Sequence, residues 1–292
     1  MGVGLIDHTG SRGFGMERRS LLCPNCGLLI SVSEENCPYC GLRAPGARWR
    51  RLPLFKLLAD PALLVKTVIG VNIGLFALAL LLDPRAMGLA FNPLLLLSPS
   101  DASLLVLGAT GTIPIDQYHR FWTLVSAGYL HAGLLHIFFN MAALRQLGGL
   151  AAREYGCSRM FIIYTAGGVF GFLISYLAGV SLTIGASAGV CGLVGAILYF
   201  GKSRGGAYGT ALYKQVGMWV VIMFVFGFVV PGINNWGHGG GLVSGALVGY
   251  LLGYDERKRE TAFHKTLAAA CLAATGLILA WAVLTSLYSR FS

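Results

Sequence analysis

Long apolar stretches recur from residue 64 to the end of the chain, and each is near the roughly 20 residues that a helix needs to cross the hydrocarbon core of a membrane. We predict seven membrane-spanning helices: 64–83, 131–150, 159–180, 186–201, 215–231, 237–254 and 265–288. The segment 86–107 is also apolar, but Pro93, Pro99 and Asp101 interrupt it, so we interpret it as a loop with interfacial pieces. The pattern therefore predicts an all-α polytopic membrane protein.

The composition excludes an ordinary soluble domain. Hydrophobic residues make up 55% and charged residues 12% of the chain, and the mean hydropathy is +0.69, whereas about 25% of the residues in soluble domains are charged. With a cytoplasmic N-terminus and an outside C-terminus, Arg85, Arg120 and Arg290 are the only Lys or Arg residues left outside, as the positive-inside rule requires. Basic cytoplasmic loops that face anionic lipid headgroups then explain the net charge of +10 without a nucleic-acid partner.

Four cysteines near the N-terminus form two Cys-x-x-Cys pairs, Cys23 with Cys26 and Cys37 with Cys40, and ten residues separate the pairs. Each pair can turn two thiolates toward one ion, so the two pairs together can complete a tetrahedral zinc site of the zinc-ribbon type. A rubredoxin-like iron site and a disulfide pair are the alternatives, and a reducing cytoplasm disfavours disulfides. Because four thiolates leave no open coordination position, we expect one structural zinc ion and a candidate docking site for a cytoplasmic protein.

These features divide the chain into four parts. We expect a cytoplasmic zinc ribbon with the start of a basic linker at 1–50 and a membrane-proximal linker at 51–63. A helical core at 64–255 and a seventh, C-terminal span at 256–292 follow. The polar start of the chain has no apolar region of a signal peptide ahead of the cysteines.

Ser187 and His238 fall inside predicted spans, about 50 residues apart. Polar side chains at bilayer depth are costly, so we interpret them first as functional. A serine becomes a nucleophile when a base takes its proton, and histidine is the commonest base. The two residues therefore suggest a serine hydrolase that works within a membrane.

Small residues on the two helices favour the close approach that such a pair needs. Glycines recur at three- and four-residue spacing in the fourth span and at every fourth position in the sixth: Gly185, Gly189 and Gly192; Gly237, Gly241, Gly245, Gly249 and Gly253. Small residues at this spacing let membrane helices pack backbone to backbone. Because no carboxylate falls inside a span, we expect a Ser–His dyad rather than a triad.

The second predicted span carries His131, His136 and Asn140. His136 and Asn140 are four residues apart and share a helix face. They can simply bond a neighbouring helix. Alternatively, they can donate hydrogen bonds to the negative oxygen that develops during acyl transfer.

On these residues, the segment 64–255 resembles the rhomboid family of intramembrane serine proteases. The family pattern is His-x-x-x-x-His-x-x-x-Asn in the second helix, Gly-x-Ser at the head of the fourth, and His followed by Gly three and seven residues later in the sixth. The matching residues are His131, His136 and Asn140; Gly185 and Ser187; and His238, Gly241 and Gly245.

The resemblance implies a six-helix core in which Ser187 is the nucleophile and His238 the general base. It implies that His136 and Asn140, with the Ser187 backbone N–H, bind the oxyanion, and that His131 and Gly185 support the site. Catalysis would need no cofactor, and the substrate would be a transmembrane protein cut near the outer face of the cell membrane. The span 265–288 matches the version of the family that has one added C-terminal helix.

Three positions depart from the family pattern. Ala188 stands where a glycine usually follows the serine, and Cys191 stands where an aromatic ring often lies beneath the base. The Trp-Arg pair of the first outer loop reads Trp122-Thr123, with Arg120 displaced. None of these changes removes a catalytic group, so we expect an active enzyme.

Other functions remain as alternatives. A catalytically silent rhomboid-like protein that binds membrane clients is the main one, and the presence of both Ser187 and His238 disfavours it. A transporter would need charged residues in its spans, and a soluble zinc-ribbon nucleic-acid binder would not need seven spans.

Overall fold

The computed structural model describes residues 20–23, 27–47, 56–84, 88–89, 96–230 and 232–291. The chain divides into two compact units, Met1–Lys56 and Leu57–Ser292, which are described separately here. The limits that we drew at residues 50, 63 and 255 stay predictions.

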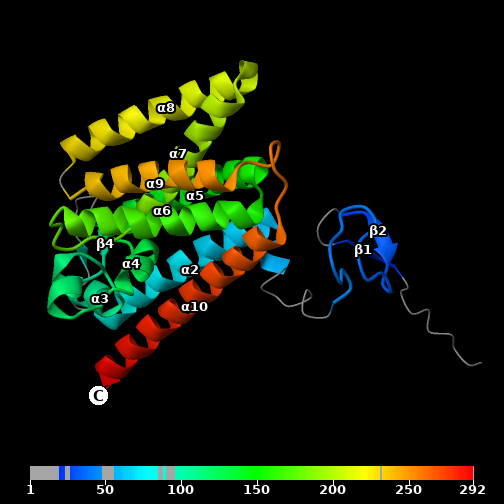
Figure 1. The fold of residues 1–292 in the computed structure, drawn as a ribbon. Helices are drawn as coiled ribbons and strands as arrows, with labels where there is room; N and C mark the ends of the chain where they lie inside the picture. Colours follow the sequence, from blue (N-terminus) through cyan, green and yellow to red (C-terminus); the bar gives the residue numbers. More distant parts are fainter. Residues whose placement is uncertain are drawn as a thin grey trace, which may run out of the picture. The chain divides into compact units, whose positions relative to one another are not determined.

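The first unit contains a small antiparallel hairpin of β1 (Ser20–Leu22) and β2 (Leu29–Ser31) (Figure 1). Leu21 pairs with Ile30 in its register. Ile30 is buried together with Cys23 and Cys37, so the centre of this unit is made largely of thiols. A core this small cannot stabilise a fold by apolar burial alone.

The second unit is helical (Figure 1). Its long helices are α2 (Pro61–Leu82), α5 (Leu134–Tyr155), α6 (Cys157–Leu177), α7 (Ser187–Arg204), α8 (Gly206–Val229), α9 (Asn235–Leu252) and α10 (Ala262–Phe291). Short elements connect α2 to α5: β3 (Gly88–Leu89), β4 (Leu96–Ser98), α3 (Asp101–Val106), η4 (Ile113–Gln117), α4 (Thr123–Ser126) and η5 (Ala127–Tyr129). The segment 86–107 thus contains no long helix in its described part, as predicted.

Four of the described helices are long and apolar enough to cross a membrane: α2, α6, α8 and α10. The segment Thr123–Tyr129 together with α5 makes a fifth if this pair, bent by 95°, is one span. The predicted spans 186–201 and 237–254 correspond to the helices α7 and α9. These two helices are rich in glycine, and they are less apolar than the four helices named above. The all-α polytopic class is confirmed, and the number of seven spans stays a prediction.

Two predicted helix boundaries are wrong. The second span does not begin at His131, because the backbone is extended at Leu130 and Gly133 and α5 begins only at Leu134. The fifth span does not begin at 215, because α8 begins at Gly206 directly after Gly205, whose positive φ of 67° ends α7. An extended segment sets the start of α5, and the positive φ of Gly205 sets the start of α8, rather than a change from polar to apolar residues.

Helix α7 lies at the centre of the unit and packs most extensively against α9 and α6. Glycines make these contacts possible. A Cβ on Gly167 of α6 would lie 2.7 Å from the Cα of Gly192, and a Cβ on Gly245 of α9 would overlap the Gly192 backbone. The helices therefore approach backbone to backbone, as the glycine spacing predicts.

This contact predicts a large loss of stability for Gly245→Ala. Because the added methyl would meet backbone that cannot turn away, we expect the free energy of unfolding to fall by about 3 kcal/mol or more, the upper end of usual overpacking. Thermal unfolding in detergent measures the effect. Gly70→Ala on α2 is the matched control, since no atom lies within 4 Å of a Cβ at that position. Equal stability of the two variants would contradict the packing described here.

Candidate active site

Ser187 and His238 lie side by side although they belong to different helices. Ser187 is the first residue of α7, and His238 lies in the first turns of α9. The Ser187 Oγ and the His238 Nε2 are 2.9 Å apart, which is hydrogen-bond distance. In the tautomer with a bare Nε2, the imidazole can take the serine proton directly.

The far side of the His238 ring carries no partner in the described part of the chain. Its Nδ1 is buried and has no hydrogen-bond partner there. A triad would place a carboxylate on this nitrogen. The dyad of Ser187 and His238 stays a prediction.

Glycines bring α9 against the start of α7. A Cβ on Gly241, one turn after His238, would overlap the Ala188 carbonyl. A Cβ on Gly171 of α6 would lie 2.6 Å from the Gly237 carbonyl and 2.9 Å from the Ala188 Cβ. The methyl group of Ala188 thus fits because Gly171 opposite it has no side chain.

His136 presents an N–H group beside Ser187. Its Nδ1 accepts a hydrogen bond from the Ala132 amide at 3.2 Å, so the neutral ring carries its proton on Nε2. A Cβ on Gly185 would lie 2.8 Å from this Nε2 and 3.6 Å from the Ser187 Oγ. Residue 185 has a φ of 126°, which favours glycine, and only glycine leaves the space between the His136 Nε2 and the Ser187 Oγ free of a side chain.

Asn140 and His131 lie around His136. The Asn140 Nδ2 donates to the His136 carbonyl at 2.9 Å, so one N–H group of this side chain is bonded to its own helix. The His131 ring is buried and meets the His136 ring edge-on, with centroids 5.0 Å apart. His131 precedes α5 rather than lying on it, so its contact with His136 arises from the bend in the chain and not from a shared helix face.

The two other departures from the family pattern have local partners. Cys191 is buried one turn after Ser187, and its thiol donates to the Met223 Sδ of α8 at 3.4 Å. Arg120 donates to the Leu105 carbonyl at 3.3 Å and so ties the two parts of the first loop together.

Sequence reasoning missed Asn234, the residue before α9. Its Oδ1 accepts from the Gly237 amide, and its Nδ2 donates to two hydroxyls on other segments, Ser175 and Thr183. An asparagine just before a helix is a usual N-cap signal. That signal marks the cap, but it does not indicate the two distant partners.

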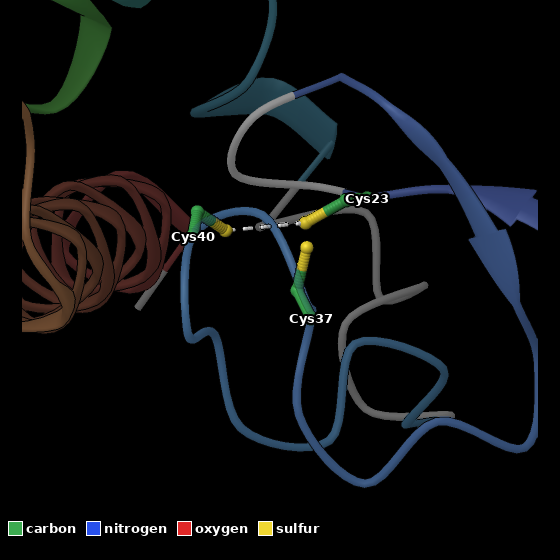
Figure 2. Close-up of side chains that lie close together, drawn as sticks. All are labelled: Cys23, Cys37 and Cys40. Atoms are coloured by element: carbon green, nitrogen blue, oxygen red, sulfur yellow. Dashed lines mark hydrogen bonds between the residues drawn. The ribbon is translucent and has the colours of Figure 1, made fainter.

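The first unit holds a candidate metal centre. The Sγ atoms of Cys23, Cys37 and Cys40 all lie within 4.8 Å of one another and point toward a common centre (Figure 2). The Cys23 and Cys40 sulfurs are 3.6 Å apart, close to the roughly 3.8 Å between thiolates that surround one zinc ion tetrahedrally at 2.3 Å. Cys26, the fourth predicted ligand, lies outside the described residues.

The backbone around these thiols has the shape of a metal-binding turn. The Gly27 amide donates to the Cys23 carbonyl at 2.9 Å, and the Gly41 amide donates to the Cys37 carbonyl at 2.8 Å. Both glycines have a positive φ, of 72° and 69°. The three thiols fit a metal ion, which Cys23, Cys37 and Cys40 would hold.

In the described helices, a serine and a histidine lie at hydrogen-bond distance, an arrangement that serine hydrolases use. Residues 118–255 match the family described as the rhomboid domain. The chain is 33% identical over 175 residues to rhomboid protease GluP of Bacillus subtilis, which covers 60% of this chain and 34% of that protein. It is 30% identical over 206 residues to RHOMBOID-like protein 1 of Arabidopsis thaliana, covering 64% and 52%. Residues 118–255 are therefore a rhomboid domain.

The relatives differ in what their names state. Inactive RHOMBOID-like protein 8 of Arabidopsis thaliana is 28% identical over 159 residues, which cover 53% of this chain and 44% of that protein. The chain spans about a third to a half of the length of these relatives. The presence of a rhomboid domain is therefore compatible with a protease and with a silent relative.

Proposed function

We propose that this protein is an intramembrane serine endopeptidase in which Ser187 is the nucleophile and His238 the general base. The observation that carries the proposal is the 2.9 Å separation of the Ser187 Oγ and the His238 Nε2. A candidate general base is judged first by whether it lies within hydrogen-bond distance of the proton it takes, and only then by its pKa. The match to the rhomboid domain and the similarity to a relative named as a rhomboid protease also support this activity.

The proposed reaction is acyl transfer in two steps. The Ser187 Oγ attacks the scissile carbonyl carbon while its proton passes to the His238 Nε2, and a tetrahedral oxyanion forms. The proton then passes from His238 to the leaving amine, the peptide C–N bond breaks, and an acyl-enzyme remains. Water attacks this ester while its proton passes to His238. The proton then passes from His238 to the Ser187 Oγ as the ester C–O bond breaks, which releases the acid and restores neutral His238 and Ser187.

The oxyanion is stabilised by donors gathered at the start of α7. His136 directs its Nε2–H toward the space over Gly185. The Ser187 amide is at the first position of α7, where backbone N–H groups have no partner within the helix and the helix dipole favours negative charge. Asn140 is the third donor in this proposal, and it would exchange its bond to the His136 carbonyl for one to the oxyanion.

The substrate class follows from where the site lies. A serine among membrane helices acts on a chain that enters the bilayer, so we propose transmembrane proteins as substrates, cut near the outer face beside a small residue. The charge distribution supports a cytoplasmic N-terminus and an outside C-terminus, and we propose the cell membrane as the location.

Reconstitution tests the proposal. Purified protein in lipid vesicles should cut a single-span test protein that has small residues near one end of its helix, and metal chelators should not block the cut. A second candidate, a silent rhomboid-like binder, is supported by the similarity to a relative that is named as inactive. Capture of the test protein without any cleavage would support that candidate instead.

We propose a structural role, rather than a catalytic one, for the metal centre. We expect one zinc ion per chain, held by Cys23, Cys26, Cys37 and Cys40, and lost when Cys23 and Cys26 become Ser. Because a unit with so small a core depends on its metal to fold, the variant should also lose the β1–β2 hairpin. Metal analysis and circular dichroism of the separately expressed segment 1–56, itself a compact unit, measure both effects. Iron in place of zinc, or a metal-free segment with an intact hairpin, would contradict this assignment.

A further inference from the structure

The start of α9 depends on a single residue. The Asn234 Oδ1 accepts from the Gly237 amide at 3.0 Å, which makes this side chain the N-cap of the helix. The Asn234 carbonyl accepts from the His238 amide at 3.1 Å, the first such bond in the helix. The backbone of His238 is therefore attached directly to Asn234.

The other end of the same side chain reaches two segments outside α9. The Asn234 Nδ2 donates to the Thr183 Oγ1 at 2.9 Å and to the Ser175 Oγ at 2.7 Å. Ser175 lies on α6 and is fully buried, and its own hydroxyl proton is used on the Gly171 carbonyl. Its lone pair is therefore available to Asn234.

Thr183 belongs to the segment that leads into the nucleophile. It precedes Ser187 by four residues, is buried, and exchanges two backbone hydrogen bonds with Thr110, of 3.1 and 2.7 Å. The Gly185 amide then donates to the Ala127 carbonyl at 2.9 Å. The backbone bonds to Thr110 and Ala127 hold this segment in place before α7 begins. A hydrogen bond from Asn234 to Thr183 therefore connects α9 to a segment whose position is fixed.

Many of the contacts at this end of α9 involve glycines. The faces of α7, α6 and α9 meet through Gly171, Gly237 and Gly241, and glycine contacts allow close approach but offer no side chain that interlocks. Hydrogen bonds are directional, so they can fix the rotation of α9 about its axis and its position along that axis. Contacts between glycines do not fix either of them in this way. Asn234 supplies two side-chain bonds of this kind to other segments at the start of the helix.

We infer that Asn234 is a positioning residue that sets the reach of His238 to Ser187, by fastening the first turn of α9 to Thr183 and Ser175. The inference rests on the proposed function of the Ser187–His238 pair. Asn234 itself touches neither of the two reacting side chains through any bond of its side chain; it acts through the backbone of α9.

Asn234→Ser separates this role from helix capping. Serine caps a helix about as well as asparagine, but it has no N–H group to reach Thr183 or Ser175. We expect kcat to fall by at least roughly tenfold with KM within about twofold, since a misplacement of about 1 Å can cost a hundredfold. The rate at which a phosphonate probe reacts with Ser187 should fall by a similar factor, while the unfolding temperature stays near that of the wild type.

Removal of the hydroxyl groups that accept hydrogen bonds from Asn234 should also slow the reaction of the probe with Ser187. Thr183→Val and Ser175→Ala each delete one acceptor, and each should lower the probe rate by less than Asn234→Ser. Combined with Asn234→Ser, neither should lower it further, because the shared bonds are already absent. Thr285→Ala on α10, whose hydroxyl bonds only the carbonyls of its own helix, is the matched control.

The outcomes separate the two proposals. Slower probe labelling and lower kcat in a stable Asn234→Ser protein, not additive with Thr183→Val, support the positioning role. Labelling and cleavage at the wild-type rate in Asn234→Ser overturn it and leave the proposed protease activity intact. Wild-type protein that neither labels at Ser187 nor cleaves overturns the protease activity and the positioning role together.

Discussion

Ser187→Ala and His238→Ala should each reduce cleavage of a single-span protein to the background rate. The Ser187 Oγ is the atom that forms the acyl bond, and the His238 Nε2 at 2.9 Å is the described group that can take its proton. In serine hydrolases, loss of either member of such a pair removes about 10⁴-fold or more of the rate. Gel assays of product formation in vesicles, over hours rather than minutes, measure this range.

The two variants must remain folded for this result to bear on chemistry. Ser187 is only half-buried, and alanine is compatible with the first position of a helix, so we expect an unfolding temperature close to that of the wild type. Thr285→Ala, a deletion of one hydroxyl far along α10, should cleave normally. Cleavage that persists in Ser187→Ala would mean that another nucleophile carries the reaction.

His136→Ala and Asn140→Ala should lower kcat by roughly 10–1,000-fold and change KM little. Donors to an oxyanion act mainly on the transition state, and loss of one costs about 2.7–4 kcal/mol in well-studied cases. We expect the larger effect at His136, because its Nε2 already faces the space beside Gly185, whereas Asn140 is bonded to its own helix. Steady-state kinetics with purified protein and one fluorescent substrate measure both constants.

Isosteric changes sharpen this test. Asn140→Asp keeps the shape of the side chain but removes both N–H donors and adds a negative charge, so it should be at least as slow as Asn140→Ala. A rise in KM with an unchanged kcat in the His136 and Asn140 variants would show instead that these residues bind substrate or only pack.

The sequence indicates the proposed reacting groups because their chemistry is rare at bilayer depth. A serine, a histidine and an asparagine stand out among apolar neighbours, and glycines at every fourth position indicate where two helices meet closely. Gly245 meets Gly192 as that spacing predicts. Periodicity of this kind is a property of single helices, and therefore it can be read from the chain before any contact is known.

The features that the sequence did not reveal depend on contacts between distant segments. Asn234 finds its acceptors 51 and 59 residues earlier in the chain, at Thr183 and Ser175, and ordinary hydroxyl residues give no sign of such a partnership. His131 was assigned to a helix because its surroundings are apolar, but the extended backbone before Leu134 places it outside. Hydropathy reports how apolar a segment is, and it does not report where a glycine breaks the helix.

The most direct test of the central claim is identification of the residue that reacts with a serine-directed phosphonate. Mass spectrometry of the labelled wild-type protein should find the adduct on Ser187, and His238→Ala should abolish it, because the serine then has no base within reach. An adduct on another residue, or labelling of Ser187 that is unchanged in His238→Ala, would contradict the assignment of these two residues as nucleophile and base.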